Sequence, residues 1–453
     1  MQVKYLIIGA GPTGLGAAHR LNELGEKDFI VLEANPHAGG LSASFKDEAG
    51  FTWDIGGHVI FSHYPYFDDL LNSILGNDYT EHRRIARIRS AGAWTPYPYQ
   101  NNIRYLPKEI QWECVEGLLP GRRPESYPSN FEEWIYTVFG EGLAKHFMLP
   151  YNFKVWAYPP KLMSFQWIGE RVSVVDLEAV LKNLILQDDN VTWGPNSQFR
   201  FPLHGGTGEI FRRMAARFND RIRFNTPLAK LDLSRKCATT QSGEEIYFTS
   251  FLSTAPLDLL AGEIITGAPD KIKEAASWLE HSGVYVAGVG TSSPREDDTC
   301  WMYFPEKDSP FYRVTNLHNY SPNIAPAGSG SRALLAEVSF SKHKREERAE
   351  LKERILAGLS NTTLLEAKAI PHTSFWSIEA EYGYPTPTPK RDRALAVIQP
   401  WLQENGVYSR GRFGGWRYEV GNMDHSVMQG VEWADLVVRN QPETIYKIPD
   451  KQA

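Results

Sequence analysis

Residues Val3 to Glu33 read VKYLIIGAGPTGLGAAHRLNELGEKDFIVLE and carry the most informative pattern in the chain. Val3 to Ile8 is a short apolar run rich in β-branched residues, which predicts a strand. The segment GAGPTG follows it, and Leu15 to Leu24 then has the spacing of a helix that ends at Gly25. Because a second apolar run, Phe29 to Leu32, comes next, the stretch predicts one βαβ unit.

The turn between this strand and this helix carries three glycines, Gly9, Gly11 and Gly14. Their lack of side chains allows the backbone to approach a pyrophosphate closely, and the helix N-terminus offers free N–H groups to it. Glu33 follows the second strand, where it can accept hydrogen bonds from ribose hydroxyls, which argues against a 2′-phosphate at this site. The stretch therefore predicts a dinucleotide site.

A second glycine pair, Gly39 and Gly40, follows Glu33 after a short loop. FAD-binding folds commonly carry such a pair and folds that bind only NAD do not need it, so FAD is the expected dinucleotide. The sequence contains no GxSxG nucleophile motif, no Cys/His pair in a recognisable context and no kinase motif. We therefore expect the cofactor to supply the reactivity.

Length and composition exclude several other classes of protein. The chain has 453 residues, which predicts two or three domains, and its 42% hydrophobic and 23% charged residues are typical of a globular protein. No apolar run is long enough to span a bilayer and no secretory signal is recognisable, so we expect a cytoplasmic protein. The net charge of −6 argues against nucleic acid as a partner. Cys114, Cys237 and Cys300 lie too far apart for a disulfide scaffold or a thiolate zinc site.

Beyond the first unit, the periodicity of the chain changes twice. Residues 130–187 have helical spacing, with Asp176 as an N-cap, and two apolar stripes are expected to be core: Phe131, Trp134, Ile135, Val138 and Phe139, then Leu177, Val180, Leu181, Leu184 and Ile185. Between them, YNFKVWAYPP (151–160) is too rich in Pro and aromatic residues for a plain helix. Strands are expected at 222–233, 246–252, 284–289, 302–304 and 334–340, and a charged helix at 342–359. A glycine-rich segment from Ser409 then leads into a last helix, which could return the chain to the cofactor.

Two histidines follow a double glycine in DIGGHVIFSHYPYF (54–67). His58, beside Gly56 and Gly57, lies where the backbone can approach a flat ring, so it is expected to touch the cofactor. For His63, the sequence is equally compatible with a role in the site and with a purely structural role. The segment has no HExxH motif and no carboxylate at a suitable spacing, so no metal site is expected.

Arginines and tyrosines in loop-like contexts are candidates for an anion site. Arg171, Arg313 and Arg412 could each bind phosphate through two N–H groups, although a single exposed arginine usually has no such role. Tyrosine hydroxyls can donate to phosphate without adding charge. Four tyrosines occur in similar contexts: Tyr303, Tyr320, Tyr384 and Tyr418. If the fold brings these groups together, they form a diphosphate clamp.

Longer motifs point to a family. The chain carries GAGPTGLGAAHRL, GGHVIFSHYPYFDD, TPYPYQNNI, YNFKVWA, GERV, WGPN, FRFP, GGTG, YFPE, PFYR, NYSP, GYPTP and SRGRFGGWRYEVGNMDHS, spread from residue 6 to about residue 432. In these motifs it closely resembles the UDP-galactopyranose mutases, particularly the eukaryotic type. The resemblance implies an α/β fold in which an FAD-binding Rossmann-like domain carries an inserted helical domain and an antiparallel β-sheet domain. The corresponding segments are 1–75, 200–260 and 405–440 for the FAD domain, 76–198 for the helical domain and 261–404 for the sheet domain.

The resemblance also implies an activity, the interconversion of UDP-galactopyranose and UDP-galactofuranose. In the chemistry proposed for the family, N5 of the reduced flavin attacks the anomeric carbon and UDP leaves, with no net redox change. Non-covalent FAD, with NADPH or NADH as reductant, is the implied cofactor. A homo-oligomer is compatible with the resemblance, whereas neither nucleic acid nor a membrane is expected as a partner.

Where the motifs match, the resemblance implies roles for individual residues of this chain. The implied cofactor-binding residues are Gly9, Gly11, Pro12, Thr13, Gly14, Glu33, Gly39, Gly40, Leu41, Gly57, His58, Arg412, Asn422 and Met423. The implied substrate-binding residues are Phe61, His63, Tyr97, Gln100, Asn152, Trp156, Arg171, Asn196, Trp301, Tyr303, Arg313, Tyr320, Tyr384 and Tyr418. Tyr97 would stack on uracil, and Asn196 would lie on a loop that closes over the substrate. The implied catalytic residues are His58, Arg171, Arg313 and Arg412.

Three alternatives stay open at this stage. An FAD-dependent amine or porphyrinogen-type oxidase shares the cofactor features but predicts an apolar or cage-like substrate site. A mutase of another nucleotide sugar would use the same chemistry. A nucleotide-sugar sensor would bind UDP without turnover.

Overall fold

A mostly parallel sheet, in which only β11 runs antiparallel to its neighbours, forms the N-terminal unit of the computed structural model, which describes residues 1–169, 172–191, 197–292 and 297–449. Strand β1 (Gln2–Ile8) lies between β12 (Glu245–Ser253) and β2 (Phe29–Leu32) and runs parallel to both. Helix α1 (Pro12–Glu23) connects β1 to β2, so the predicted βαβ unit is confirmed. Four further strands join this sheet: β9 (Ile222–Arg223), β10 (Leu228–Asp232), β11 (Cys237–Thr240) and β18 (Val407–Ser409).

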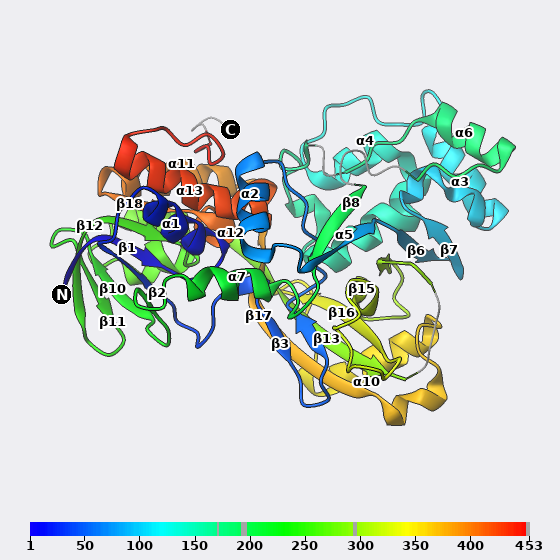
Figure 1. Ribbon diagram of the computed structural model, residues 1–453. Helices are drawn as coiled ribbons and strands as arrows, with labels where there is room; N and C mark the ends of the chain where they lie inside the picture. The colour runs from blue at the N-terminus through cyan, green and yellow to red at the C-terminus, as the bar shows by residue number, and fades with distance from the viewer. Residues whose placement is uncertain (170–171, 192–196, 293–296, 450–453) are drawn as a thin grey trace.

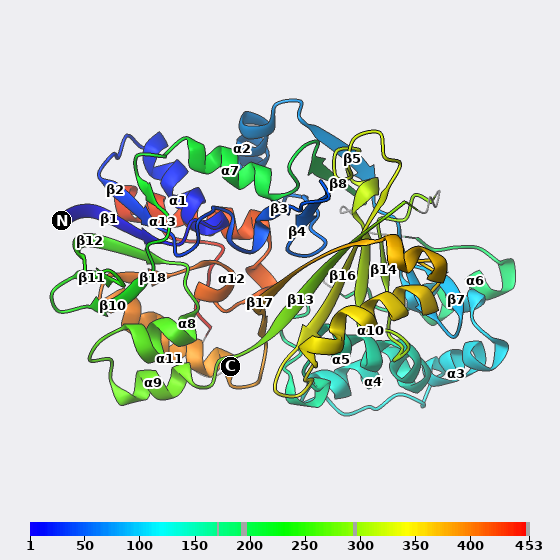
Figure 2. The same cartoon turned by 90° about the horizontal axis from the view of Figure 1, so that it is seen from below.

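Helices cover both faces of this sheet (Figures 1 and 2). On one face α1 packs against α13 (Met423–Arg439), and on the other lie α9 (Asp270–Ala276) and α11 (Arg391–Glu404). The side chains of β1 alternate between the two layers, because Tyr5 and Ile7 join one buried cluster while Leu6 and Ile8 join the other. Burial on both faces explains why this strand is apolar throughout its second half.

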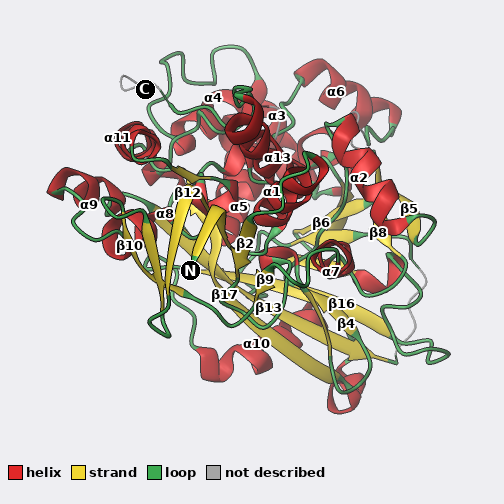
Figure 3. Cartoon of the chain, turned by 60° about the vertical axis from the view of Figure 1, so that its left-hand side comes forward, coloured by secondary structure: helices red, strands yellow, loops and turns green. Residues whose placement is uncertain are grey.

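A second sheet is almost entirely antiparallel. Its order is β17 (Ser374–Thr386), β13 (Glu280–Thr291), β16 (Arg332–Phe340), β15 (Arg313–Asn316), β14 (Trp301–Tyr303), β6 (Ala86–Ser90) and β7 (Ala93–Pro96), and only β14 and β6 run parallel. Helix α10 (Arg348–Asn361) covers one face, as Figures 2 and 3 show, through the buried side chains of Leu351, Ile355 and Leu359. The strands expected within 284–340 are thus present.

Four main helices form the third region: α3 (Lys108–Leu118), α4 (Phe131–Leu143), α5 (Leu149–Trp156) and α6 (Leu177–Leu186). The Asp176 carboxylate accepts a hydrogen bond of 3.0 Å from the Ala179 N–H, which confirms the predicted N-cap of α6. Of the first predicted stripe, Phe131, Ile135 and Phe139 are buried.

Segments cross between these regions. Strands β6 and β7, from the stretch expected to be mainly helical, pair with the antiparallel sheet, and α9 and α11, from the stretch assigned to the sheet domain, pack on the parallel sheet. The bounds of the three domains therefore stay a prediction. No helix in the described ranges is long and apolar enough to cross a bilayer.

Three local expectations are wrong. Residues 149–156 form helix α5, because Pro150 occupies its first turn and Pro159 and Pro160 lie beyond its end. The segment 222–233 divides into β9 and β10, since Asn225 has a φ of +52° and Pro227 follows. In α6, Leu181 and Ile185 are 36% and 76% exposed, because that helix lies at the edge of the molecule and buries Val180 instead (Figure 1).

Candidate active site

A cavity of about 620 Å³ opens at the glycine-rich turn after β1. Its volume lies within the range of sites that enclose a cofactor. Among the predicted cofactor-binding residues, Gly9, Gly11, Pro12, Thr13, Glu33, Gly40, Leu41, Arg412 and Met423 line it. A Cβ on Gly40 would lie 3.4 Å from the Cα of Gly11, so two glycine segments form adjoining parts of the wall. A wall without side chains, next to the N-terminus of α1, fits the diphosphate part of FAD.

The remaining predicted glycines shape this turn without lining the cavity. A Cβ on Gly14 would lie 1.9 Å from the carbonyl oxygen of Gly9. Gly39 has a φ of +109°, a left-handed conformation that favours glycine. Glu33 holds the turn from the other side, because its Oε2 accepts a 2.7 Å hydrogen bond from the Ala10 N–H. Its Oε1 accepts from the N–H of Asn35 at 2.8 Å.

A second cavity of about 230 Å³ adjoins the first, and seven residues line both: Leu41, Ser42, Ile55, Ala380, Arg412, Gly421 and Met423. Its wall brings together predicted site residues from distant parts of the chain: Gly57, His58, Phe61, Arg313, Tyr384, Tyr418 and Asn422. The two cavities therefore form one continuous site.

His58 lines the smaller cavity and follows Gly56 and Gly57, and the φ of Gly56 is +109°. Its Nδ1 has no hydrogen-bond partner within the described ranges, and Oδ2 of Asp54 is 4.0 Å away. Burial lowers the pKa of His58 to about 4, with Glu337 acting against the shift and Arg313 and Arg412 adding to it. The imidazole is therefore neutral at pH 7.

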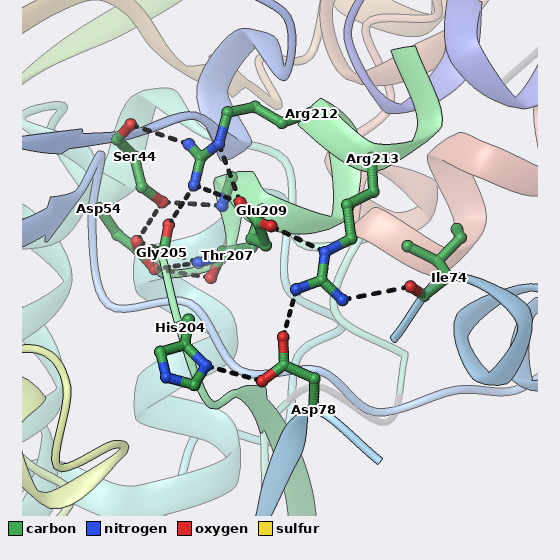
Figure 4. A network of polar contacts seen from close by, with 11 residues as sticks. Ser44, Asp54, Ile74, Asp78, His204, Gly205, Thr207, Glu209, Arg212 and Arg213 are labelled. Atoms are coloured by element: carbon green, nitrogen blue, oxygen red, sulfur yellow. Dashed lines mark hydrogen bonds and ion pairs between the residues drawn. The ribbon is translucent and has the colours of Figure 1, made fainter. Parts of the chain in front are cut away.

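Asp54, four residues before His58, belongs to a polar network with Ser44 and Thr207 (Figure 4). Its carboxylate accepts hydrogen bonds from the hydroxyls of Ser44 (2.5 Å) and Thr207 (2.6 Å), and it caps α7 (Gly208–Ala216) through the Thr207 N–H (3.2 Å). Burial raises the pKa of Asp54 to about 6, although these hydrogen bonds oppose the shift. The GGTG motif thus positions a carboxylate and the start of a helix.

Arg313 is held by Glu337, a residue that was not expected from the sequence. The guanidinium donates to Glu337 through Nε and Nη2, both at 2.8 Å, and three of its five N–H groups remain for other acceptors. Burial by itself would raise the pKa of Glu337, but Arg313 and the other donors hold it below its usual range. Glu337 interrupts the apolar run 334–340, and a lone acid within a buried strand was the available signal.

Arg412 lies between the two cavities. Its Nε and Nη1 donate to the carbonyl oxygens of Gly383 and Gly421, both at 3.2 Å. Its guanidinium lies over the rings of Tyr384 (5.1 Å) and Tyr418 (5.2 Å). No carboxylate pairs with it among the described residues. Arg412 therefore brings an uncompensated positive charge to the site.

Aromatic side chains form the wall beyond these arginines. Trp156 lies 5.7 Å from Tyr384 and 4.9 Å from Tyr418, measured between ring centroids. Tyr303 lies 6.0 Å from Tyr97 and 6.4 Å from Trp301. This arrangement gathers most of the predicted tyrosines and tryptophans in one region.

The hydroxyl of Tyr320 is buried and has no hydrogen-bond partner in the part of the chain that the structure describes. Burial raises its pKa well above the usual value, with Arg313 and Arg84 acting in the opposite direction. Arg84, which was not expected, is also buried and lies over the rings of Phe61 (5.3 Å) and Trp301 (5.4 Å). Its position in the basic stretch HRRIARIR favoured a surface role, so the sequence offered no usable signal.

Three predicted residues are occupied by other contacts. Gln100 donates to the carbonyl of Ser173 (2.5 Å) and Asn152 to that of Met148 (2.7 Å). His63 contacts Asp424 through Nδ1 (2.7 Å), and Asp424 also contacts Nδ1 of His425 (3.0 Å). The expectation that no carboxylate lies near His63 is therefore wrong, because the fold supplies one from the start of α13. Arg171 and Asn196 lie outside the described residues.

Comparison with known proteins shows which family the chain belongs to. The model of the flavin containing amine oxidoreductases matches residues 12–438, so the chain belongs to this family of flavin enzymes. The chain is also similar to the crystal structure of a reduced UDP-galactopyranose mutase, with 43% identity and a TM-score of 0.93 over 98% of this chain and 95% of that one. The resemblance to UDP-galactopyranose mutases and the expected fold class are thereby confirmed.

A more distant structural match shows the fold alone, and a curated relative matches over a short segment. A putative protoporphyrinogen oxidase from Exiguobacterium sp. 255-15 has 18% identity and a TM-score of 0.71 over 97% of this chain and 99% of that one. The 15-cis-phytoene desaturase of Glycine max is 39% identical over 86 residues, which are 18% of this chain and 15% of that protein. The match therefore spans only a small part of that curated relative.

Proposed function

We propose that this chain interconverts UDP-galactopyranose and UDP-galactofuranose with FAD as its cofactor. One observation carries the proposal: the glycine-walled cavity continues, at Arg412, into a pocket that holds two guanidinium groups. A flavin site that opens onto arginines suits a substrate with a diphosphate, whereas an amine or porphyrinogen oxidase needs an apolar or cage-like site. The similarity to a UDP-galactopyranose mutase over nearly the whole chain supports this interpretation.

Arg313 and Arg412 are proposed to bind the diphosphate and to stabilise its charge as UDP leaves. Both retain N–H groups for which no described residue is an acceptor, and Tyr384 and Tyr418 lie beside Arg412 with hydroxyls suited to phosphate oxygens. Arg171 is proposed as a second clamp on its motif alone.

His58 is proposed to lie against the flavin as a neutral imidazole, which follows from the low pKa that burial imposes. Glu33 is proposed to accept from a ribose hydroxyl, since its Oε2 has lone-pair capacity beyond the Ala10 N–H. Once reduced, the bound flavin supplies the nucleophile that the side chains of the protein lack. NADPH or NADH is the proposed reductant, and we propose a cytoplasmic location.

The proposal is tested with purified enzyme reduced by dithionite and supplied with UDP-galactofuranose. Chromatography should show conversion to UDP-galactopyranose by the reduced enzyme and none by the oxidised enzyme. Peroxide production with an amine, and no sugar conversion, would instead identify an oxidase. Tight UDP binding without turnover after reduction would identify a sensor, and conversion of a different nucleotide sugar would correct the substrate.

A further inference from the structure

Glu337 accepts four hydrogen bonds inside the site although its side chain is only 2% exposed. Oε1 accepts from the Gly57 N–H (2.9 Å) and from Nε of Arg313 (2.8 Å). Oε2 accepts from Nη2 of Arg313 (2.8 Å) and from the Tyr312 hydroxyl (2.6 Å). A buried carboxylate is costly unless such donors satisfy it. The four bonds together therefore fix the position of the Glu337 carboxylate.

These donors come from two separate segments. Gly57 belongs to the loop that carries His58, whereas Arg313 begins β15, and both line the smaller cavity. The N–H of the loop and the Nε of the guanidinium share a single oxygen atom, Oε1. A displacement of the loop at Gly57 therefore changes the geometry at Arg313 directly.

The space around Gly57 leaves this loop little freedom. A Cβ on Gly57 would lie 2.2 Å from Oγ1 of Thr315 and 3.3 Å from Oε1 of Glu337. The loop thus lies in close contact with the floor formed by β15 and β16. It cannot move toward these strands unless Glu337 or Thr315 moves as well.

We propose that Glu337 is a positioning residue that couples the loop at Gly56–His58, where the flavin is proposed to bind, to Arg313. The position of the loop at Gly56–His58 depends on the cofactor beside it, and Glu337 converts that position into the orientation of Arg313. This inference rests on the proposed function. Because such coupling is reciprocal, a change in flavin state that alters UDP affinity must be matched by an equal effect of UDP on the flavin midpoint potential.

The experiment measures UDP dissociation constants for the oxidised and the dithionite-reduced holoenzyme, together with the midpoint potential with and without UDP. The wild-type constants are expected to differ by at least about fivefold, the lower end of typical coupling. A tenfold difference corresponds to a potential shift of about 30 mV for a two-electron couple. In Glu337→Asp the charge remains, but the shorter side chain cannot reach both Gly57 and Arg313. UDP should still bind, and the two constants should agree within about twofold.

Two further variants keep the test decisive. Glu337→Gln removes the charge and replaces one acceptor oxygen by an N–H donor, which breaks one of the two bonds that orient Arg313 in either orientation of the amide. The difference between the two constants should therefore shrink, and this variant replaces Glu337→Asp if that one loses its flavin. Tyr312→Phe is the matched control, because it removes a donor to Oε2 but leaves the Gly57–Glu337–Arg313 link, and it should keep the wild-type difference. A wild-type difference below about twofold, or an unchanged difference in the Glu337 variants, would overturn the coupling. UDP binding to neither state of the wild type would contradict the proposed function instead.

Discussion

Arg313 combines a protein partner with capacity for a ligand. Its two bonds to Glu337 fix the orientation of the guanidinium, and the remaining N–H groups face a cavity. Sequence inspection singled out Arg313 because it follows two aromatic residues in PFYR. It could not identify Glu337, Arg84 or Asp424, because their importance comes from residues distant in the sequence. Glu337 contacts Arg313 (24 residues away), Arg84 lies over Trp301 (217 residues away), and Asp424 contacts His63 (361 residues away).

Replacing Arg313 by alanine is expected to weaken UDP binding by about 1.5–3 kcal/mol, the range for hydrogen bonds to charged groups. The change also leaves Glu337 as an unpaired buried charge, so stability should fall as well. Titration calorimetry with UDP measures the first effect and chemical denaturation the second. Arg235→Ala is the control, because Arg235 forms a similar two-bond pair with Glu245 that is exposed and lines neither cavity. Unchanged UDP affinity in folded Arg313→Ala would show that Arg313 does not bind the diphosphate.

Tyr320 allows ligand binding and stability to be separated. Its buried hydroxyl has no partner in the described part of the chain, so Tyr320→Phe should leave the free energy of unfolding unchanged or slightly higher. If the hydroxyl donates to the bound nucleotide sugar, UDP-galactose should bind about 0.5–1.5 kcal/mol more weakly to the reduced enzyme. Tyr5→Phe, which removes another buried hydroxyl from a residue that lines neither cavity, is the control. Equal affinity in wild type and Tyr320→Phe would remove Tyr320 from the substrate site.

At the level of elements, the contact between α1 and α13 ties the two ends of the chain to the cofactor cavity. A Cβ on Gly16 would lie 2.4 Å from the carbonyl oxygen of Val427, and one on Gly430 would lie 2.0 Å from that of Thr13. The two helices thus pack backbone against backbone. The turn from Gly9 to Gly14 precedes α1 directly, so this contact fixes the glycine wall of the cavity.

Gly16→Ala is therefore expected to destabilise the protein by about 1–3 kcal/mol, the usual cost of overpacking, and to lower its flavin content. The absorbance ratio of flavin to protein after purification measures the second effect. Gly262→Ala is the control, because its added Cβ would meet only Ala276 Cβ at 3.7 Å, which is ordinary contact. Normal flavin content in Gly16→Ala would show that α1 can shift without disturbing the cavity.

The elements also show what local pattern can and cannot predict. The strand–turn–helix at residues 3–24 was predictable because its pattern depends on residues close in sequence. Helix α5 was missed because aromatic and proline content was taken as a break, although Pro150 occupies a position that tolerates proline. Leu181 and Ile185 repeat with helical spacing, but only packing determines which part of a stripe is covered.

For the whole molecule, the fold class followed from the glycine turn and the long motifs, whereas the meeting of the two cavities did not. That junction depends on Ile55, Ala380 and Arg412 arriving from three separate segments. The same compactness buries titratable groups, and buried groups make stability depend on pH. Burial lowers the pKa of His318, as it does that of His58, to about 4.

His318 should destabilise the folded protein as pH falls. In the unfolded chain its pKa is about 6.5, so between pH 6.5 and 4 the unfolded state binds a proton that the folded state does not. Asp54, with a pKa raised to about 6, acts in the opposite direction, so only a comparison of variants isolates the histidine. Between pH 7 and 4.5 the wild type should lose about 2 kcal/mol more unfolding free energy than His318→Gln, measured by chemical denaturation. His372→Gln, which changes an exposed histidine, should follow the wild type. Parallel pH profiles for wild type and His318→Gln would show that His318 takes up its proton equally in both states.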